Sequence, residues 1–347
     1  MIAPASGGWR MPAEWEPHER CLIAWPTRRE LWGHHLDAAR AEHAAVAVAV
    51  AAFEPVTVVA APGDADSARA ECPADVDVIE LAIDDSWLRD SGPLGIVDDC
   101  GNRRAVDFEF NAWGERWHPF DDDRQISRRL LERLGIERVE SPMVLEGGSI
   151  TVDGQGTAIT TEQCLLHPNR NPEWSRADIE AELARTLGVS RVIWLPWGFA
   201  EDDETDGHVD GVCTFAAPGV VVAHGVPDTT EFPGNPNADL MRANLDVLRS
   251  AVDATGAPFE VIEIPHISYF DVDDAPYRTS AMNFYVANRG VVVPVADGDG
   301  SERDRIVLDV ISAAFPDREV VGVRSRLLAF GGGGVHCITQ QVPAAGA

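Results

Sequence analysis

The spacing of apolar residues predicts helices that alternate with short strands along most of the chain. The first helix is rich in alanine and stops at Glu54-Pro55, and the third lies between an N-cap at Ser175 and a terminating Gly188. The predicted helices cover residues 36–53, 124–134, 175–187, 238–252 and 302–314. The predicted strands cover residues 56–61, 76–83, 106–110, 149–152, 157–161, 192–195, 212–216, 220–223, 259–264, 282–286, 291–295 and 320–323.

The order of these elements predicts an α/β fold in one domain spanning residues 1–347. One helix with several short strands recurs about five times, and no polar linker separates the copies. Such a recurrence favours units arranged around an axis over a single doubly wound sheet.

Composition limits the partners that the chain can have. Its formal net charge is -29, and arginine supplies all 28 basic residues. A basic footprint for nucleic acid is therefore missing, whereas an acidic field attracts small cations. No apolar run is long enough to span a membrane, and the N-terminus lacks the apolar core of a signal peptide. The six cysteines have no paired spacing, which predicts reduced thiols in the cytoplasm.

A run of four glycines near the C-terminus precedes a short apolar segment that carries Cys337. Glycines in series let another group approach the backbone closely, which suits a nucleophile. A lone cysteine in an apolar run is otherwise a small core residue. If this segment is a strand, the adjacent His336 points to the opposite face and does not reach the thiol. The best candidate for the base is then His208.

The segment around His208 concentrates ionisable groups. If it is extended from Glu204 onward, then Glu204, Asp206, His208 and Asp210 share one face, because side chains alternate along a strand. Carboxylates on both sides should favour the charged form of the histidine. The alternative is a solvated acidic loop, although the apolar strand that follows favours burial.

Two further carboxylates stand in unusual settings. Asp90 follows an apolar strand and precedes a Gly-Pro turn, and Glu146 lies between apolar residues and a glycine pair. Side chains at strand ends often project into sites that the scaffold holds rigid. Each carboxylate alone is more often a surface or capping residue.

Seven blocks of the sequence resemble agmatine deiminases and the related bacterial peptidyl-arginine deiminases, in the order found in that family. They are MPAEWEPHER, WLRDSGP, DFEFNAWGE, LEGGSITVDGQGT, ETDGHVD, NFYVAN and GGGGVHCITQQ, which begin at Met11, Trp87, Asp107, Leu145, Glu204, Asn283 and Gly331. The resemblance implies a five-bladed α/β propeller (pentein) of the guanidino-group-modifying superfamily, with pseudo-fivefold symmetry. It also implies that no metal or organic cofactor is used.

The resemblance assigns roles residue by residue. Cys337 would be the nucleophile, His208 the general acid and base, and Asp90 with Asp210 the carboxylates that hold the guanidinium. Glu146 would orient His208. The side chains that would pack against the alkyl chain of the substrate, or else only into the core, are Trp87 and Trp113. These roles suit the chemistry, because a planar guanidinium matches carboxylates in bidentate geometry and presents its carbon to a thiolate.

Two departures from the family pattern bear on the substrate. Gly334 stands where the family usually has asparagine, which predicts a looser approach to Cys337, and Ala281 stands where it usually has tyrosine. The expected reaction is deimination of a small cationic guanidino compound through a covalent amidino-cysteine. Agmatine is the first candidate substrate. Its product would be N-carbamoylputrescine, which leads to putrescine in polyamine biosynthesis. Peptidyl or free arginine derivatives are the alternative, and a homodimer is left open.

Functions of other classes rest on the same residues. A metal-dependent ureohydrolase would use Asp206, His208 and Asp210, with further carboxylates in the segment 271–274. That hypothesis leaves the glycine run and Cys337 without a role. A non-catalytic guanidinium binder would need neither Cys337 nor His208, and transfer of the amidino group to an amine would need a second substrate.

Overall fold

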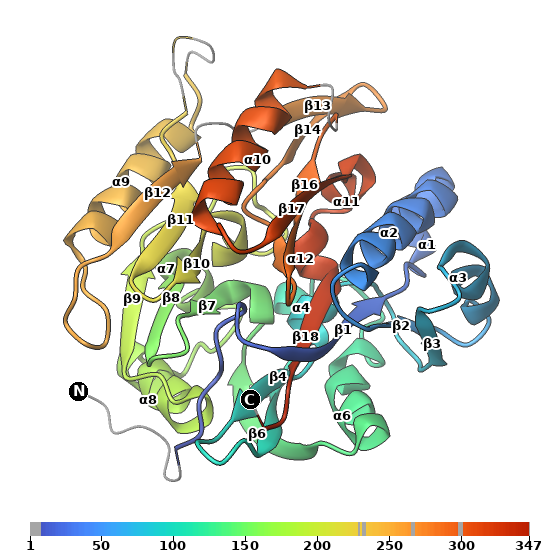
Figure 1. The fold of residues 1–347 in the computed structure, drawn as a ribbon, viewed down its shortest axis with the longest axis horizontal. Helices are drawn as coiled ribbons and strands as arrows, with labels where there is room; N and C mark the ends of the chain where they lie inside the picture. The colour runs from blue at the N-terminus through green and yellow to red at the C-terminus, as the bar shows by residue number, and fades with distance from the viewer. Residues whose placement is uncertain (1–7, 228–229, 231–233, 265–267, 298–300, 347) are drawn as a thin grey trace.

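The computed structural model describes residues 8–227, 230, 234–264, 268–297 and 301–346. Its fold is mixed α/β, with most strands in several small sheets rather than in one large sheet. The longer helices α2, α6, α8, α9 and α10 lie toward the outside of the molecule, and the strands lie nearer its centre (Figure 1).

Five sheets share one local pattern. A first strand pairs antiparallel with a second, and a helix then leads to a third strand that is parallel to the second. The first of these units contains β4 (Leu94–Val97), β5 (Arg103–Glu109), α6 (Asp123–Leu134) and β6 (Glu137–Val144). The second contains β7 (Ile150–Val152), β8 (Thr157–Thr161), α8 (Arg176–Leu187) and β9 (Arg191–Leu195).

The pattern continues to the C-terminus and then returns to the N-terminus. The third unit contains β10 (Cys213–Ala217), β11 (Val220–His224), α9 (Asn237–Ser250) and β12 (Glu260–Ile264). The fourth contains β15 (Tyr285–Val286), β16 (Gly290–Val295), α10 (Glu302–Ala314) and β17 (Glu319–Arg324). The fifth contains β18 (Thr339–Pro343), β1 (His18–Ala24), α2 (Leu36–Ala51) and β2 (Val56–Ala60), followed by α3 (Ala65–Glu71) and β3 (Asp77–Glu80).

The two ends of the chain are held together in the fifth sheet, where Cys21 of β1 pairs with Gln341 of β18. Glu54, just after α2, ties this sheet to the fourth unit. Its buried carboxylate accepts hydrogen bonds from the Tyr285 hydroxyl at 2.6 Å and from the Asn288 N–H at 2.7 Å. The segment that carries Cys337 therefore runs between two anchored parts of the chain, the fourth unit before it and β18 after it.

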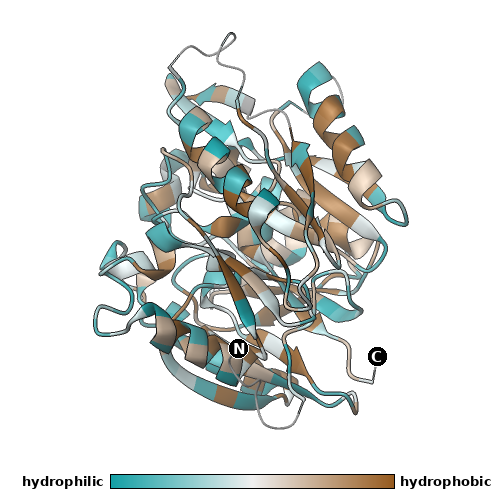
Figure 2. Cartoon of the chain, turned by 90° about the vertical axis from the view of Figure 1, so that its left-hand side faces the viewer, coloured by the Kyte–Doolittle hydropathy of each residue, from teal (hydrophilic) through white to brown (hydrophobic). Residues whose placement is uncertain are grey.

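Apolar residues fill the space between each sheet and its helix. β2 and β16 are buried along their whole length, and the exposed positions lie mainly on the helices and loops. The hydropathy colouring in Figure 2 follows this arrangement, with hydrophobic strands inside and hydrophilic residues on many of the loops and outer helical turns. Among the described residues, no helix has the length and apolar content needed to cross a membrane.

The shorter elements carry much of the candidate site. These helices and turns are α1 (Arg29–Trp32), η1 (Gly33–His35), α4 (Leu88–Ser91), α5 (Ala112–Glu115), η2 (Gly147–Ser149), α7 (Glu162–Leu165), η3 (Val209–Gly211), α11 (Arg326–Phe330) and α12 (Val335–Ile338). A hairpin of β13 (Ser268–Val272) and β14 (Ala275–Thr279) is separate from the five sheets.

The five predicted helices are confirmed to within two residues at each end. The strand predicted over residues 76–83 is shorter, because only Asp77–Glu80 pairs with β2. That predicted over residues 282–286 is reduced to Tyr285–Val286. Six strands were not predicted from the sequence: β1, β4, β6, β13, β14 and β18.

The predicted cap of α8 allows a test of local stability. Asp178 N–H donates to the Ser175 hydroxyl, and the Asp178 carboxylate accepts from Ser175 N–H at 2.8 Å. Ser175→Ala should lower the free energy of unfolding by roughly 0.5–2 kcal/mol, the usual cost of losing an N-cap. Urea denaturation followed by circular dichroism measures this change. Ser175→Asn keeps an acceptor and serves as the control, so equal losses in both variants would contradict the capping role.

Candidate active site

The predicted site residues other than Glu146, which is fully buried, line one cavity of about 500 Å³ or a smaller space beside it. The larger cavity reaches His208, Asp210 and Cys337. The smaller one is lined by Trp87, Asp90 and Trp113, and also by Cys337. Segments from α4, α5, η3 and α12 therefore converge on the thiol, although more than two hundred residues separate some of them in sequence.

Cys337 lies on the short helix α12, so the prediction of a strand after the glycines is wrong. Gly334 is the N-cap of that helix. The preceding residue, Gly333, packs closely against Trp87. A Cβ at Gly333 would lie 2.4 Å from the Trp87 ring and 3.0 Å from Cys337 Cβ. The missing side chain thus lets the Trp87 ring pack directly against the segment that carries the thiol.

The Cys337 thiol has polar and acidic neighbours. Its Sγ lies 3.3 Å from Asn283 Oδ1 and 3.6 Å from Asp210 Oδ2. Burial raises the pKa of the thiol well above its ordinary value, and the negative charges of Asp210 and Asp90 raise it further. The free protein therefore holds a protonated thiol at neutral pH.

The segment 204–210 is irregular rather than extended, so the prediction of one shared face is wrong. Asp206 and Gly207 have φ values of 59° and 88°, and η3 begins at Val209. His208 and Asp210 line the cavity, whereas Asp206 binds Arg170 Nη1 at 2.7 Å. Two positive φ values in succession turn the chain between these side chains, which a strict strand alternation could not do.

Gly148 is the point at which three of the predicted residues meet. A Cβ there would lie 2.7 Å from His208 Nδ1, 2.8 Å from Asp90 Oδ1 and 2.9 Å from Asp210 Oδ2. The Gly148 N–H also donates to Asp90 Oδ1 at 2.9 Å. The glycine pair after Glu146 is thus required because a larger residue would occupy the space that these side chains share.

His208 is buried between two carboxylates. Its Nδ1 lies 3.8 Å from Asp90 Oδ1, and its Nε2 lies 3.9 Å from Glu146 Oε2. Burial opposes the charge of the ring, but Asp90, Cys164 and Glu146 outweigh it and raise the pKa of His208 well above its ordinary value. His208 therefore keeps its proton at neutral pH.

The three site carboxylates differ in their surroundings. Burial raises the pKa of Asp90, whose Oδ2 accepts from Trp113 Nε1 at 3.0 Å. Burial also opposes the charge of Glu146, but Arg170, with Nε at 2.6 Å, brings the net pKa below its usual value. The pKa of Asp210 is likewise lowered despite burial, chiefly by its hydrogen bond with His336.

His336 and Asn283 belong to the site, although the sequence assigned them no role. His336 Nδ1 lies 2.9 Å from Asp210 Oδ2, and its Nε2 lies 2.7 Å from Glu14 Oε1. The imidazole is therefore engaged by two carboxylates rather than by the adjacent thiol. Its position next to Cys337 in the sequence could have indicated a role in the site. The predicted strand excluded it, because neighbouring residues on a strand point to opposite faces.

Asn283 fills the space beside Gly334. Its Oδ1 accepts from Cys337 N–H at 3.2 Å, and its Nδ2 donates to Asp210 Oδ2 at 3.0 Å. A Cβ at Gly334 would lie 2.5 Å from Asn283 Oδ1. The glycine at position 334 thus has a close neighbour and does not leave the open approach that the departure from the family pattern predicted.

One group of site residues has ligand atoms close enough to hold a metal ion. Glu146, Cys164 and His208 place theirs within 4.8 Å of one another. Arg170 already binds Glu146, so a cation is present beside this group. The set predicted for a ureohydrolase, Asp206 with His208 and Asp210, is not among the candidate metal groups of the described residues.

The chain is similar to known proteins over nearly its whole length. The agmatine deiminase of Pseudomonas aeruginosa is 42% identical over 366 residues, covering 98% of this chain and 97% of the relative. That of Medicago truncatula is 40% identical over 372 residues, with 98% of both chains covered. A solved structure of agmatine deiminase from Enterococcus faecalis has a TM-score of 0.91 at 34% identity, over 97% of this chain and 96% of that one.

The match to a protein family extends over almost the whole chain. The family described as Porphyromonas-type peptidyl-arginine deiminase matches residues 10–343. This range includes each residue that lines the site, from Glu14 to Cys337. The chain therefore belongs to the Porphyromonas-type peptidyl-arginine deiminase family.

Proposed function

We propose that the protein is a hydrolase of linear amidines that deiminates agmatine to N-carbamoylputrescine and ammonia. The observation that carries this proposal is the convergence of Cys337, Asp90, Asp210 and His208 on one cavity. Relatives that match the full length of the chain bear the name agmatine deiminase. Cys337 acts as the nucleophile, and the reaction passes through a covalent amidino-cysteine.

Asp90 and Asp210 hold the guanidinium group. Both are buried beside Cys337, and a guanidinium between them offers paired N–H donors to each carboxylate. The same two charges raise the pKa of the thiol. A bound cation offsets them, so the substrate itself promotes loss of the Cys337 proton. The tryptophan rings of Trp87 and Trp113 pack along the alkyl chain.

The reaction then proceeds in two stages. The Cys337 thiolate adds to the guanidinium carbon, and His208 gives its proton to the nitrogen that leaves as ammonia. Neutral His208 next removes a proton from water, whose oxygen attacks the amidino carbon. The carbon–sulfur bond breaks, the remaining hydroxyl proton passes to solvent, and the ureido product leaves, with Cys337 again a thiolate and His208 again protonated. Glu146 keeps His208 oriented and charged for the first stage.

The outer end of the cavity suits a second positive charge. Four consecutive acidic residues line it, Glu201, Asp202, Asp203 and Glu204. Arg278 also lines it, but its Nε lies 3.5 Å from Glu201 Oε2. The acidic excess favours the distal ammonium of agmatine, whereas Arg278 is the feature that favours a carboxylate and thus the alternative of arginine derivatives.

The proposal also includes the arrangement of the sheets, the compartment and the cofactor requirement. The five sheets of common pattern form the blades of a five-bladed propeller with pseudo-fivefold symmetry, in a single domain of residues 1–347. The free thiols suit the reducing cytoplasm. The reaction needs no cofactor, metal, nucleic acid or membrane, and its product leads to putrescine in polyamine biosynthesis. A homodimer is compatible with this role.

Replacing the nucleophile gives the first test of this function. Cys337→Ser should lower kcat for ammonia release from agmatine by about 10³-fold or more, because the covalent route is lost. Cys100→Ser, which changes an exposed thiol, is the matched control and should keep full activity. Ammonia and urea are assayed with and without a chelator. Full activity in Cys337→Ser would refute the nucleophile, and chelator-sensitive urea release would favour a ureohydrolase instead.

The role of the four acidic residues 201–204 in binding the distal ammonium can be tested separately. Glu204 is exposed to the cavity and accepts from Trp117 Nε1 at 3.1 Å. Glu204→Gln should raise KM for agmatine by about 2- to 5-fold, as expected for one exposed ion pair. Its effect on a butylguanidine without the amine should be negligible. Equal changes in KM for both substrates, or a preference of the unaltered protein for arginine, would count against recognition of the distal ammonium.

The charge of His208 predicts a pH dependence. Since its folded-state pKa is raised, the protonated acid persists at neutral pH and is lost as pH rises through that pKa. Glu146→Gln removes a nearby negative charge, so the alkaline limb of kcat should move to lower pH. Asp206 continues to pair with Arg170 in this variant.

The measurement is kcat from ammonia release across the alkaline range. Glu162→Gln, which removes an exposed carboxylate paired with Arg176, is the control and should leave the profile unchanged. An alkaline limb that stays in place in Glu146→Gln, or moves upward, would contradict the role given to Glu146.

A further inference from the structure

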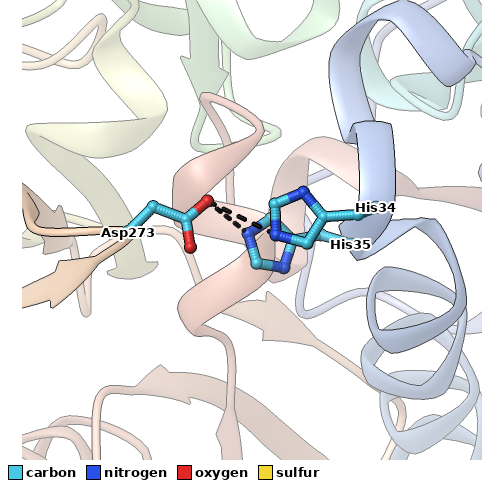
Figure 3. Close-up of side chains that lie close together, drawn as sticks. All are labelled: His34, His35 and Asp273. Atoms are coloured by element: carbon cyan, nitrogen blue, oxygen red, sulfur yellow. Dashed lines mark hydrogen bonds and ion pairs between the residues drawn. The ribbon is translucent and has the colours of Figure 1, made fainter.

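The tip of the β13–β14 hairpin meets η1 through a cluster that the reaction does not use. His34 and His35 come from η1, and Asp273 comes from the turn between the two strands (Figure 3). Asp273 Oδ2 lies 2.9 Å from His35 Nε2 and 3.6 Å from His34 Nε2. Two segments that are 238 residues apart in the chain thus place two imidazoles on one carboxylate oxygen.

These atoms have the spacing of ligands in a metal site. The three ligand atoms lie within 4.8 Å of one another. Bonds of about 2.0–2.1 Å in a tetrahedral Zn²⁺ site put ligand atoms roughly 3.3 Å apart. This value lies between the distances from Asp273 Oδ2 to His35 Nε2 and to His34 Nε2, which are 2.9 Å and 3.6 Å. Imidazole nitrogen and carboxylate oxygen are ligands that Zn²⁺ prefers. The distances from Asp273 Oδ2 to the two imidazole nitrogens therefore suit a shared ion.

The cluster is open to ions in solution. The side chains of His34 and Asp273 are 76% and 53% exposed, while that of His35 is 17% exposed and packs against Phe330. A net charge of -29 raises the local concentration of cations around the molecule. Water can supply the remaining ligands on the exposed side.

The same hairpin forms part of the wall of the candidate active site. Tyr277 and Arg278 of β14 line the larger cavity, together with Phe330 of α11. The Phe330 ring lies 5.0 Å from the ring of His35 and 5.3 Å from that of Tyr277, between centroids. The cluster therefore fastens the outer end of this wall to η1.

We propose that His34, His35 and Asp273 form a binding site for one Zn²⁺ ion, which fixes the β13–β14 hairpin against η1. The ion is bound by two Nε2 atoms and one carboxylate oxygen and keeps open positions for water. It takes no part in the bond-breaking steps, so this site does not depend on the identity of the substrate.

Titration of the purified, chelator-treated protein with Zn²⁺ in a calorimeter tests the site. Asp273→Asn and His34→Gln should each weaken binding by at least about tenfold, the lower end of the loss caused even by outer-shell changes. Asp274→Asn is the matched control on the same turn, where Asp274 also has a positive φ that asparagine tolerates. It should bind as the unaltered protein does.

Cobalt(II) distinguishes this cluster from the thiols of the active site. The proposed site should give visible bands without the intense near-ultraviolet charge-transfer absorption of a thiolate complex. Zn²⁺ should also slow hydrogen exchange in peptides covering β13 and β14 in the unaltered protein but not in Asp273→Asn. Equal affinity in Asp273→Asn and the unaltered protein, or thiolate absorption that accounts for all bound cobalt, would overturn the proposal.

Discussion

The structure depends on keeping several carboxylates charged in a place from which water is largely excluded. Asp90, Glu146 and Asp210 are all buried. An isolated buried carboxylate is costly and tends to take up a proton. Fixed cations offset part of this cost: Arg170 for Glu146, and His336 for Asp210. Among the residues that the structure describes, Asp90 pairs with no cation except His208, 3.8 Å away, and its pKa is the one that rises.

This balance explains why the site draws on so many separate segments. Arg170 also binds Asp206, and Asp206 stabilises the turn before His208. Glu14 binds His336 on the side of the imidazole away from Asp210. Burial raises the pKa of Glu14, but the positive charges of His336 and Arg89 outweigh this effect and lower it to about 2. Asp210 is thus held by His336, and His208 by Glu146, and neither of these partners lines the cavity. Loss of one rear partner would leave an uncompensated charge, which is far more damaging than loss of the pair.

The sequence was sufficient for the outer helices of the fold and for a set of side chains that the structure brings close together, among them Asp90, His208 and Cys337. Helices such as α8 and α10 carry their end signals within a few residues, so local rules found them. β1 and β18 were missed because their pairing joins the two ends of the chain, and a local pattern contains no trace of that partner. The same limit applies to the way the small sheets are arranged, for which local sequence offered only a recurrence of elements.

The errors within the site have a related physical cause. Strand alternation assigned faces to residues 204–210, but the φ values at Asp206 and Gly207 reverse the chain there, and tertiary contacts with Arg170 and Gln163 support that turn. A strand was also assumed around Cys337, whereas four residues form one helical turn after the glycines. His336 consequently turned from a neighbour without a role into a partner of Asp210.

The charges around the Cys337 thiol bear on which ligands can promote its ionisation. The free site holds a thiol whose pKa is raised by burial and by the carboxylates that face it. A neutral ligand leaves those carboxylates uncompensated, so it cannot promote ionisation of Cys337. In the proposed function, a guanidinium offsets those charges as it binds, and its carbon then lies beside the sulfur. If Asp90 and Asp210 hold the guanidinium as proposed, the charges that raise the pKa of the Cys337 thiol are also the charges that select a cationic ligand.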